Sequence, residues 1–138
     1  MENEERKTVP AKGNDLSDRL IDFAVRVIRL VQSLPNNMCG RHIAGQLLRS
    51  GTSAGANYEE ARGAESRADF SHKIGVAWKE AKESLYWLKV VHRTELVKRS
   101  RIADLIDEAD QLCAILNRSR STARKRDEKN NPGTDHAS

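Results

Sequence analysis

Residues 66–93 read SRADFSHKIGVAWKEAKESLYWLKVVHR, and no other part of the chain specifies a helix as clearly. Apolar side chains recur here every three or four residues, which places them on one face of a helix. They are Phe70, Ile74, Ala77, Ala81, Leu85, Leu88 and Val91. Ser66 with Asp69 three residues later has the spacing of a helix-capping pair, so we predict that the helix opens at Ser66 and continues to about Arg93.

The same spacing predicts three more helices. The first runs from about residue 15 to Pro35, which stops it, and the second from about residue 38 to Gly63. The last follows a polar connection at 94–100 and has the strictest stripe. The predicted core positions of these helices are Leu16, Leu20, Phe23, Val27, Leu30 or Val31, and Leu34; Ile43, Leu47, Leu48, Ala54 and Tyr58; and Ile102, Leu105, Ile106, Ala109, Leu112, Cys113 and Leu116.

No segment alternates apolar and polar residues as a strand does, so the predicted fold class is all-α. Four helices of similar length with short connections pack most simply as an up-and-down antiparallel four-helix bundle. We assign the bundle to residues 14–118. Residues 1–13 are expected to be a disordered lead and residues 119–138 a disordered basic tail.

Small residues cluster in the second helix. Gly45, Gly51 and Gly55 each weaken a helix by about 1 kcal/mol relative to alanine. We therefore expect a neighbouring helix to approach the backbone closely there. Residues 51–55 also spell G-x-S-x-G, but a nucleophile elbow needs a strand before the serine, which the pattern lacks.

Composition limits the function classes. The chain has 138 residues and a net charge of +4, most of it in residues 115–138. We expect no signal peptide and no membrane span, since the chain has no apolar run near the roughly 20 residues that span a bilayer, and it has only two cysteines. Bundle metal sites use Glu-x-x-His, which is absent. We expect a cytoplasmic protein that does not bind membranes, is not an enzyme, and has no catalytic residue, metal or cofactor.

Two groups of cations are candidates for nucleic-acid binding. Lys79, Lys82, Tyr86, Lys89 and Arg93 fall on one line of the third helix, and a basic line with an aromatic can contact phosphates and stack a base. The second group is the tail, with Arg118, Arg120, Arg124, Lys125 and Arg126. A solvated helix face and a solvated tail without a partner are the alternatives for these groups.

An apolar group lies off the core stripe of the third helix. Val76, Trp87 and Val90 share a further face with Glu80 and Glu83. Because a tryptophan beside valines on a surface is typical of protein contacts, we predict a subunit interface there.

Three runs resemble one known family. They are LRSGTSAGANYEEA at 48–61, ESRADF at 65–70 and LYWL at 85–88. Together they resemble the four helix bundle proteins, also known as the 23S rRNA intervening sequence proteins, over about residues 15–118. The resemblance implies a four-helix protomer, a ring of five around a channel, and no known enzymatic activity. Some members are encoded within insertions in large-subunit ribosomal RNA genes. A related branch serves diversity-generating retroelements, where a basic pentamer engages a reverse transcriptase and nucleic acid.

The residues that match the family signature are Arg49, Ser53, Asn57, Glu60, Ser66, Asp69 and Phe70. The first four form one polar line along the second helix, and because buried polar groups must be paired, we expect a structural or subunit-contact role rather than a ligand site. Tyr58 departs from the isoleucine that relatives often carry. The body of the chain is also nearly neutral, unlike the retroelement proteins.

Two hypotheses follow. The first is a homo-oligomeric scaffold, expected to be a pentamer, that binds RNA or DNA through its basic surfaces. The second is a protein-interaction module whose Trp87 and Val90 face captures an unknown protein partner, with the tail serving only solubility.

Overall fold

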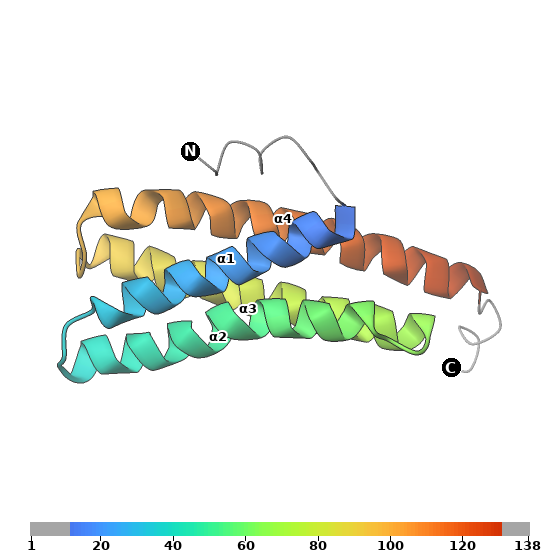
Figure 1. Cartoon of the computed structure of the whole chain (residues 1–138), viewed down its shortest axis with the longest axis horizontal. Helices are drawn as coiled ribbons and strands as arrows, with labels where there is room; N and C mark the ends of the chain where they lie inside the picture. Colours follow the sequence, from blue (N-terminus) through green and yellow to red (C-terminus); the bar gives the residue numbers. More distant parts are fainter. Residues whose placement is uncertain (1–11, 131–138) are drawn as a thin grey trace.

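The computed structural model describes residues 12–130, which form four helices and, within that range, no strand. The helices are α1 (Lys12–Gln32), α2 (Met38–Arg62), α3 (Arg67–Arg93) and α4 (Arg99–Asn130). Short connections join them, and successive helices run in opposite directions (Figure 1). The prediction of an all-α four-helix bundle is confirmed, whereas the five-fold ring stays a prediction.

The helix boundaries follow from local capping. The Asn37 side chain accepts a hydrogen bond from the Gly40 amide at 2.8 Å and starts α2. Ser66 does the same for the Asp69 amide at 3.1 Å and starts α3, as its spacing predicted. Gly63 ends α2 by donating its amide to the Glu59 and Glu60 carbonyls. The Asn37 and Ser66 side chains and the Gly63 amide replace the partners that the first and last turns of a helix lack.

The fourth helix is longer than its apolar stripe predicted. It continues to Asn130, so residues 119–130 are helical where we expected a disordered tail. No proline or glycine lies between Arg99 and Pro132, and residues 119–130 are rich in good helix formers. The expected lead at 1–13 lies almost wholly outside the described residues, although α1 already includes Lys12 and Gly13.

One apolar face of each helix forms a common core. The fully buried side chains with the largest volume include Phe23, Leu47, Ile74 and Leu112. Most predicted core positions are buried, but Leu48 is exposed. Leu47 and Leu48 are about 100° apart on a helix, so only one of them can face the core. Phe70, Leu85 and Ile106 are half-buried at its margin.

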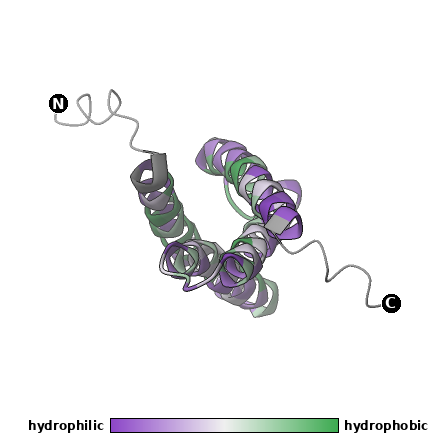
Figure 2. Ribbon diagram, turned by 90° about the vertical axis from the view of Figure 1, so that its right-hand side faces the viewer, coloured by the Kyte–Doolittle hydropathy of each residue, from purple (hydrophilic) through white to green (hydrophobic). Residues whose placement is uncertain are grey.

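The helix pairs are not equivalent. A methyl group on Gly51 would lie 2.8 Å from Val27 Cγ1, and one on Gly55 would lie 3.3 Å from Leu20 Cβ. The predicted close approach is therefore confirmed at these two glycines, between α1 and α2, whereas Gly45 faces open space. By contrast, α1 and α4 make the fewest contacts of any neighbouring pair, and a view along the bundle shows them more widely separated (Figure 2).

Candidate nucleic-acid interface

The basic line of α3 is open to solvent. Lys79, Lys82, Lys89 and Arg93 are exposed, and the Tyr86 side chain is 58% exposed. Among residues 12–130, none of these four cations forms an ion pair. Unpaired cations around an exposed aromatic ring are suited to phosphate contact and base stacking. The alternative of a solvated face stays open.

Trp78 joins this line to α4. Its ring lies 4.3 Å from Lys82 Nζ and 4.2 Å from the guanidinium carbon of Arg120. Two cations against one indole are a cation–π arrangement, in which tryptophan is the strongest partner. Sequence reasoning did not single out Trp78. The spacing of four residues between Trp78 and Lys82 was a usable signal, but the contact with Arg120 depends on how α3 and α4 are aligned.

The basic residues predicted in the tail lie on a continuous helix. Arg118, Arg124, Lys125 and Arg126 are exposed, and Arg120 is half-buried with its Nη2 donating to Asn117 Oδ1 at 2.9 Å. Residues 118–130 carry a net charge of +4. Because a helix fixes the spacing of these cations, the segment presents a defined cationic surface rather than a flexible arm.

Cys113 is a core residue beside this surface. Burial raises the pKa of its thiol to about 11, and the nearby Asp110 carboxylate also raises it. Lys82 and Lys89 act in the opposite direction because positive charge favours the thiolate. A neutral, buried thiol is not a nucleophile, which agrees with the predicted core position.

Four polar side chains link α2 to α3 near the middle of the bundle. Arg49 donates to both carboxylate oxygens of Glu80, at 3.2 and 3.3 Å, and also to Glu83. The hydrogen bond from Arg49 holds the pKa of the Glu83 carboxyl below its ordinary value, and the Trp87 indole, which donates to Glu83 at 3.2 Å, lowers that pKa too. Arg49 is therefore tied to acids of its own subunit.

Asn57 and Glu60 of the signature line also find partners within the protomer. Asn57 donates to the Ser53 carbonyl at 2.9 Å, one turn earlier on α2. Glu60 lies 3.7 Å from Lys73, which pairs in turn with Asp69 at 3.5 Å. These contacts support a structural role, whereas a role in subunit contact stays a prediction.

The comparisons with known proteins agree with the four-helix fold. The family model described as 23S rRNA-intervening sequence protein matches residues 13–118. The chain belongs to this family. A crystal structure of a protein with unknown function from the S23 ribosomal protein family of Bacteroides thetaiotaomicron is 38% identical, with a TM-score of 0.71. The match covers 76% of this chain and 97% of that one. The search of curated proteins found no match.

The match to the 23S rRNA-intervening sequence family ends inside the cationic surface. It includes the α3 line, Trp78 and the polar contacts of Arg49, but it stops at residue 118. The helical segment 119–130 lies beyond it. The part of α4 that carries Arg120 and Arg126 is therefore not covered by the family model.

The residues predicted to form a subunit interface are half-buried. Trp87 and Val90 pack against the core, and the Trp87 ring meets His42 and Tyr86 edge-on, at 5.8 and 5.0 Å between ring centres. Val76 is also half-buried. Whether a second subunit covers the remaining surface of these three side chains stays a prediction.

A larger exposed apolar surface, which we call the α1 stripe, was missed. It consists of Ile21, Val25 and Ile28, which are 56%, 38% and 38% exposed. They are spaced by four and three residues, on the side of α1 opposite its core residues. This spacing is present in the sequence, but we assigned only the longer apolar stripe of the same helix, which forms the core.

Three specific features can be checked in the described part of the chain: the 51–55 motif, clusters of metal-ligating side chains and membrane-spanning helices. Residues 51–55 lie within α2 rather than at a strand-to-helix turn, so they are not a nucleophile elbow. Within residues 12–130, no three His, Cys, Asp or Glu side chains gather where they could hold a metal ion. No helix in that range is long and apolar enough to cross a membrane.

Proposed function

We propose that the chain is a non-enzymatic, cytoplasmic, homo-oligomeric scaffold that binds RNA or DNA through the cationic surface of α3 and α4. The observation that carries the proposal is the Trp78 contact, where Lys82 of α3 and Arg120 of α4 meet on one ring. It connects two groups of cations, far apart in the sequence, into one surface. The family is described as 23S rRNA-intervening sequence protein, and this link to ribosomal RNA is consistent with a nucleic-acid ligand.

Affinity on such a surface comes mainly from phosphate contacts. Each lysine or arginine that neutralises a phosphate releases a counterion, so binding weakens steeply with salt and shows little base preference. Repetition of the surface in an oligomer adds avidity without new contacts.

The α1 stripe supports self-association. Ile21, Val25 and Ile28 place three aliphatic side chains in water, and Leu48 of α2 is also exposed. Covering them with a second copy of the chain removes apolar area from water. A ring of five, as the family resemblance implies, is the oligomer that we propose.

The test is fluorescence anisotropy with a labelled structured RNA and a labelled duplex DNA at two salt concentrations. Two triple variants each remove three charges from the proposed surface. The α3 variant is Lys79→Gln, Lys89→Gln and Arg93→Gln. The α4 variant is Arg124→Gln, Lys125→Gln and Lys129→Gln. We expect each to bind more weakly and to reduce the slope of log K against log salt by up to about 3.

The control removes the same number of charges from exposed positions elsewhere, with Arg29→Gln, Arg41→Gln and Arg101→Gln. It should bind nearly as well as the parent. Absence of binding at low salt, or a salt-insensitive and sequence-selective complex, would overturn the proposal.

A protein-interaction module is the second candidate, and the α1 stripe favours it. If the parent chain is monomeric and does not bind nucleic acid, this stripe and the Trp87 and Val90 face are the surfaces to test against a partner protein.

A further inference from the structure

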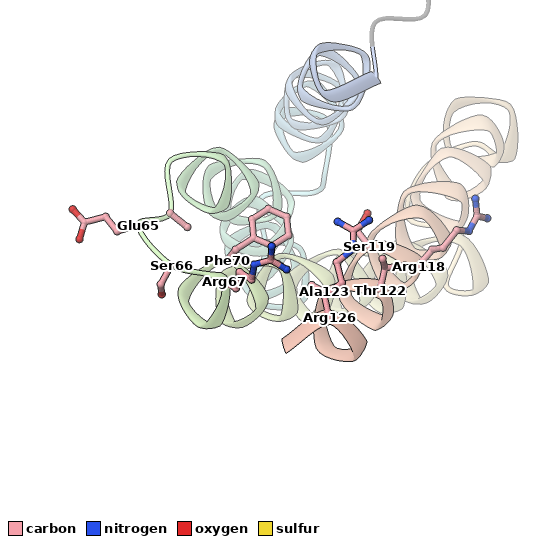
Figure 3. Close-up of a pocket in the computed structure, with 10 residues that line it drawn as sticks. Glu65, Ser66, Arg67, Phe70, Arg118, Ser119, Thr122, Ala123 and Arg126 are labelled. Atoms are coloured by element: carbon pink, nitrogen blue, oxygen red, sulfur yellow. The ribbon is translucent and has the colours of Figure 1, made fainter. Parts of the chain in front are cut away.

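A pocket lies at the far end of the cationic surface. The turn between α2 and α3, the first turn of α3 and the last part of α4 line an open pocket of about 720 Å³. Its lining residues come from 64–70 and 118–126, two segments that are separated in the sequence (Figure 3). Pockets of this size hold small organic groups.

The charge of the pocket is positive. Three arginines, Arg67, Arg118 and Arg126, line it against a single acid, Glu65. None of the three arginines has an ion-pair partner in the described range 12–130. In the close-up, Glu65 and Arg118 point away on opposite sides, whereas Arg67 and Phe70, both from the first turn of α3, are drawn between them (Figure 3).

Polar and aromatic groups complete the lining. The helix α3 begins at Arg67, so the positive end of its dipole faces this region. Ser119 and Thr122 of α4 supply hydroxyl groups. Phe70 is half-buried, packs in part against the core, and also lines the pocket. An aromatic ring next to guanidinium groups is the combination that single-stranded nucleic acids use, with a base on the ring and a phosphate on the cations.

We infer that this pocket takes one unpaired nucleotide of a bound single strand, with its base against Phe70 and its phosphate at Arg67 and Arg126. The inference rests on the proposed function and deepens it. A base within a duplex must leave its stack to enter the pocket, which costs free energy. The pocket therefore makes the chain prefer single strands, whereas the α3 line contacts phosphates of either form.

The experiment measures anisotropy of a labelled 20-nucleotide oligouridine and of a labelled 20-base-pair RNA duplex with the full chain. Phe70→Leu keeps an apolar side chain and removes the ring. Base stacking on an aromatic ring contributes about 1–3 kcal/mol, so we expect single-strand binding to fall by roughly five- to a hundred-fold. Duplex binding should not change. Phe70→Tyr keeps an aromatic ring, so it should bind the single strand about as well as the parent does.

The charge variants have a matched control. Arg126→Gln should weaken single-strand binding more than Arg124→Gln does. Arg124 carries the same charge and lies two residues earlier, but its side chain does not line the pocket. If the parent binds oligouridine and Phe70→Leu binds equally well, the pocket inference fails while the proposed function stands. If the parent binds neither probe at low salt, the proposed function itself fails.

A second measurement needs no variant, in case Phe70→Leu does not fold. Oligouridine that carries 5-iodouridine is irradiated with the parent chain, and the attachment site is mapped by mass spectrometry. We expect attachment at Phe70. Attachment only at Tyr86, on the α3 line, would overturn the inference.

Discussion

The α1–α2 half and the α3–α4 half of the bundle are joined in different ways. Between α1 and α2, Gly51 and Gly55 remove side chains, so the Val27 and Leu20 side chains pack directly on the backbone of α2. Between α3 and α4, large side chains reach across, as Arg120 does to Trp78. The first half has aliphatic side chains on its outer surface and the second has cations. In the function that we propose, the first half therefore presents the surface for a second copy of the chain and the second half the surface for nucleic acid.

The largest expected effect tests the outer surface of the first half. We predict that the parent chain has several times the mass of 15.5 kDa in light scattering. Glutamates at two positions of the α1 stripe, Ile21→Glu with Val25→Glu, should reduce the mass to that of a protomer, because charges buried in an interface without partners are costly.

The control for this experiment adds two glutamates to exposed positions of α4, Ala103→Glu with Ala114→Glu, and should keep the parent mass. A parent chain that is monomeric at micromolar concentration would contradict the oligomer. If only Val90→Glu dissociates it, the interface lies at Val76, Trp87 and Val90.

The next effect tests the close packing of the first half. Gly51→Ala places a methyl group against the stiff Val27 side chain, and overpacking of this kind costs about 1–3 kcal/mol. The better helix propensity of alanine returns about 1 kcal/mol. We expect a lower denaturant midpoint for Gly51→Ala.

Gly45→Ala is the matched control. It makes the same change on the same helix, but the added methyl group faces open space. Here the gain in propensity is unopposed, so the free energy of unfolding should rise by about 0.5–1 kcal/mol. Equal midpoints for the two variants would show that α1 does not approach the backbone of α2 as described.

The contact between α3 and α4 should have a smaller, local effect. Trp78→Leu removes the ring that Lys82 and Arg120 share, and the lost cation–π contact contributes about 1 kcal/mol. The end of α4 should open more often, so amide hydrogen exchange in residues 119–129 should become about five-fold faster. Trp87→Leu is the control, since it changes the other tryptophan, which is also half-buried. It should leave hydrogen exchange in residues 119–129 unaltered.

These contacts also mark the limit of what the sequence could predict. Apolar spacing within one helix was enough to predict the four helices and most of the core, and the cost of glycine in a helix was enough to predict the close approach at Gly51 and Gly55. It could not predict features that depend on the alignment of two helices, such as Trp78 with Arg120 or Phe70 with Thr122. The end of α4 was missed because the apolar stripe stops at Leu116. Beyond it, the helix is supported by Arg120 on Trp78 and by intrinsic propensity.

The smallest expected effect lies where the two halves meet, at Arg49 of α2 and Glu83 of α3. The pKa of Glu83 is lowered in the folded chain, so its ionised form favours folding above the ordinary value of 4.5. This contribution is lost as the pH falls through the lowered value. Because the pair is exposed, the effect on stability is small.

Glu83→Gln should lower the melting temperature relative to the parent at pH 7, and this difference in melting temperature should narrow in acid. Glu128→Gln, at an exposed position that has no ion-pair partner among residues 12–130, should show no such trend. A difference for Glu83→Gln that is constant with pH would show that the ionised Glu83 carboxylate does not stabilise the fold through Arg49.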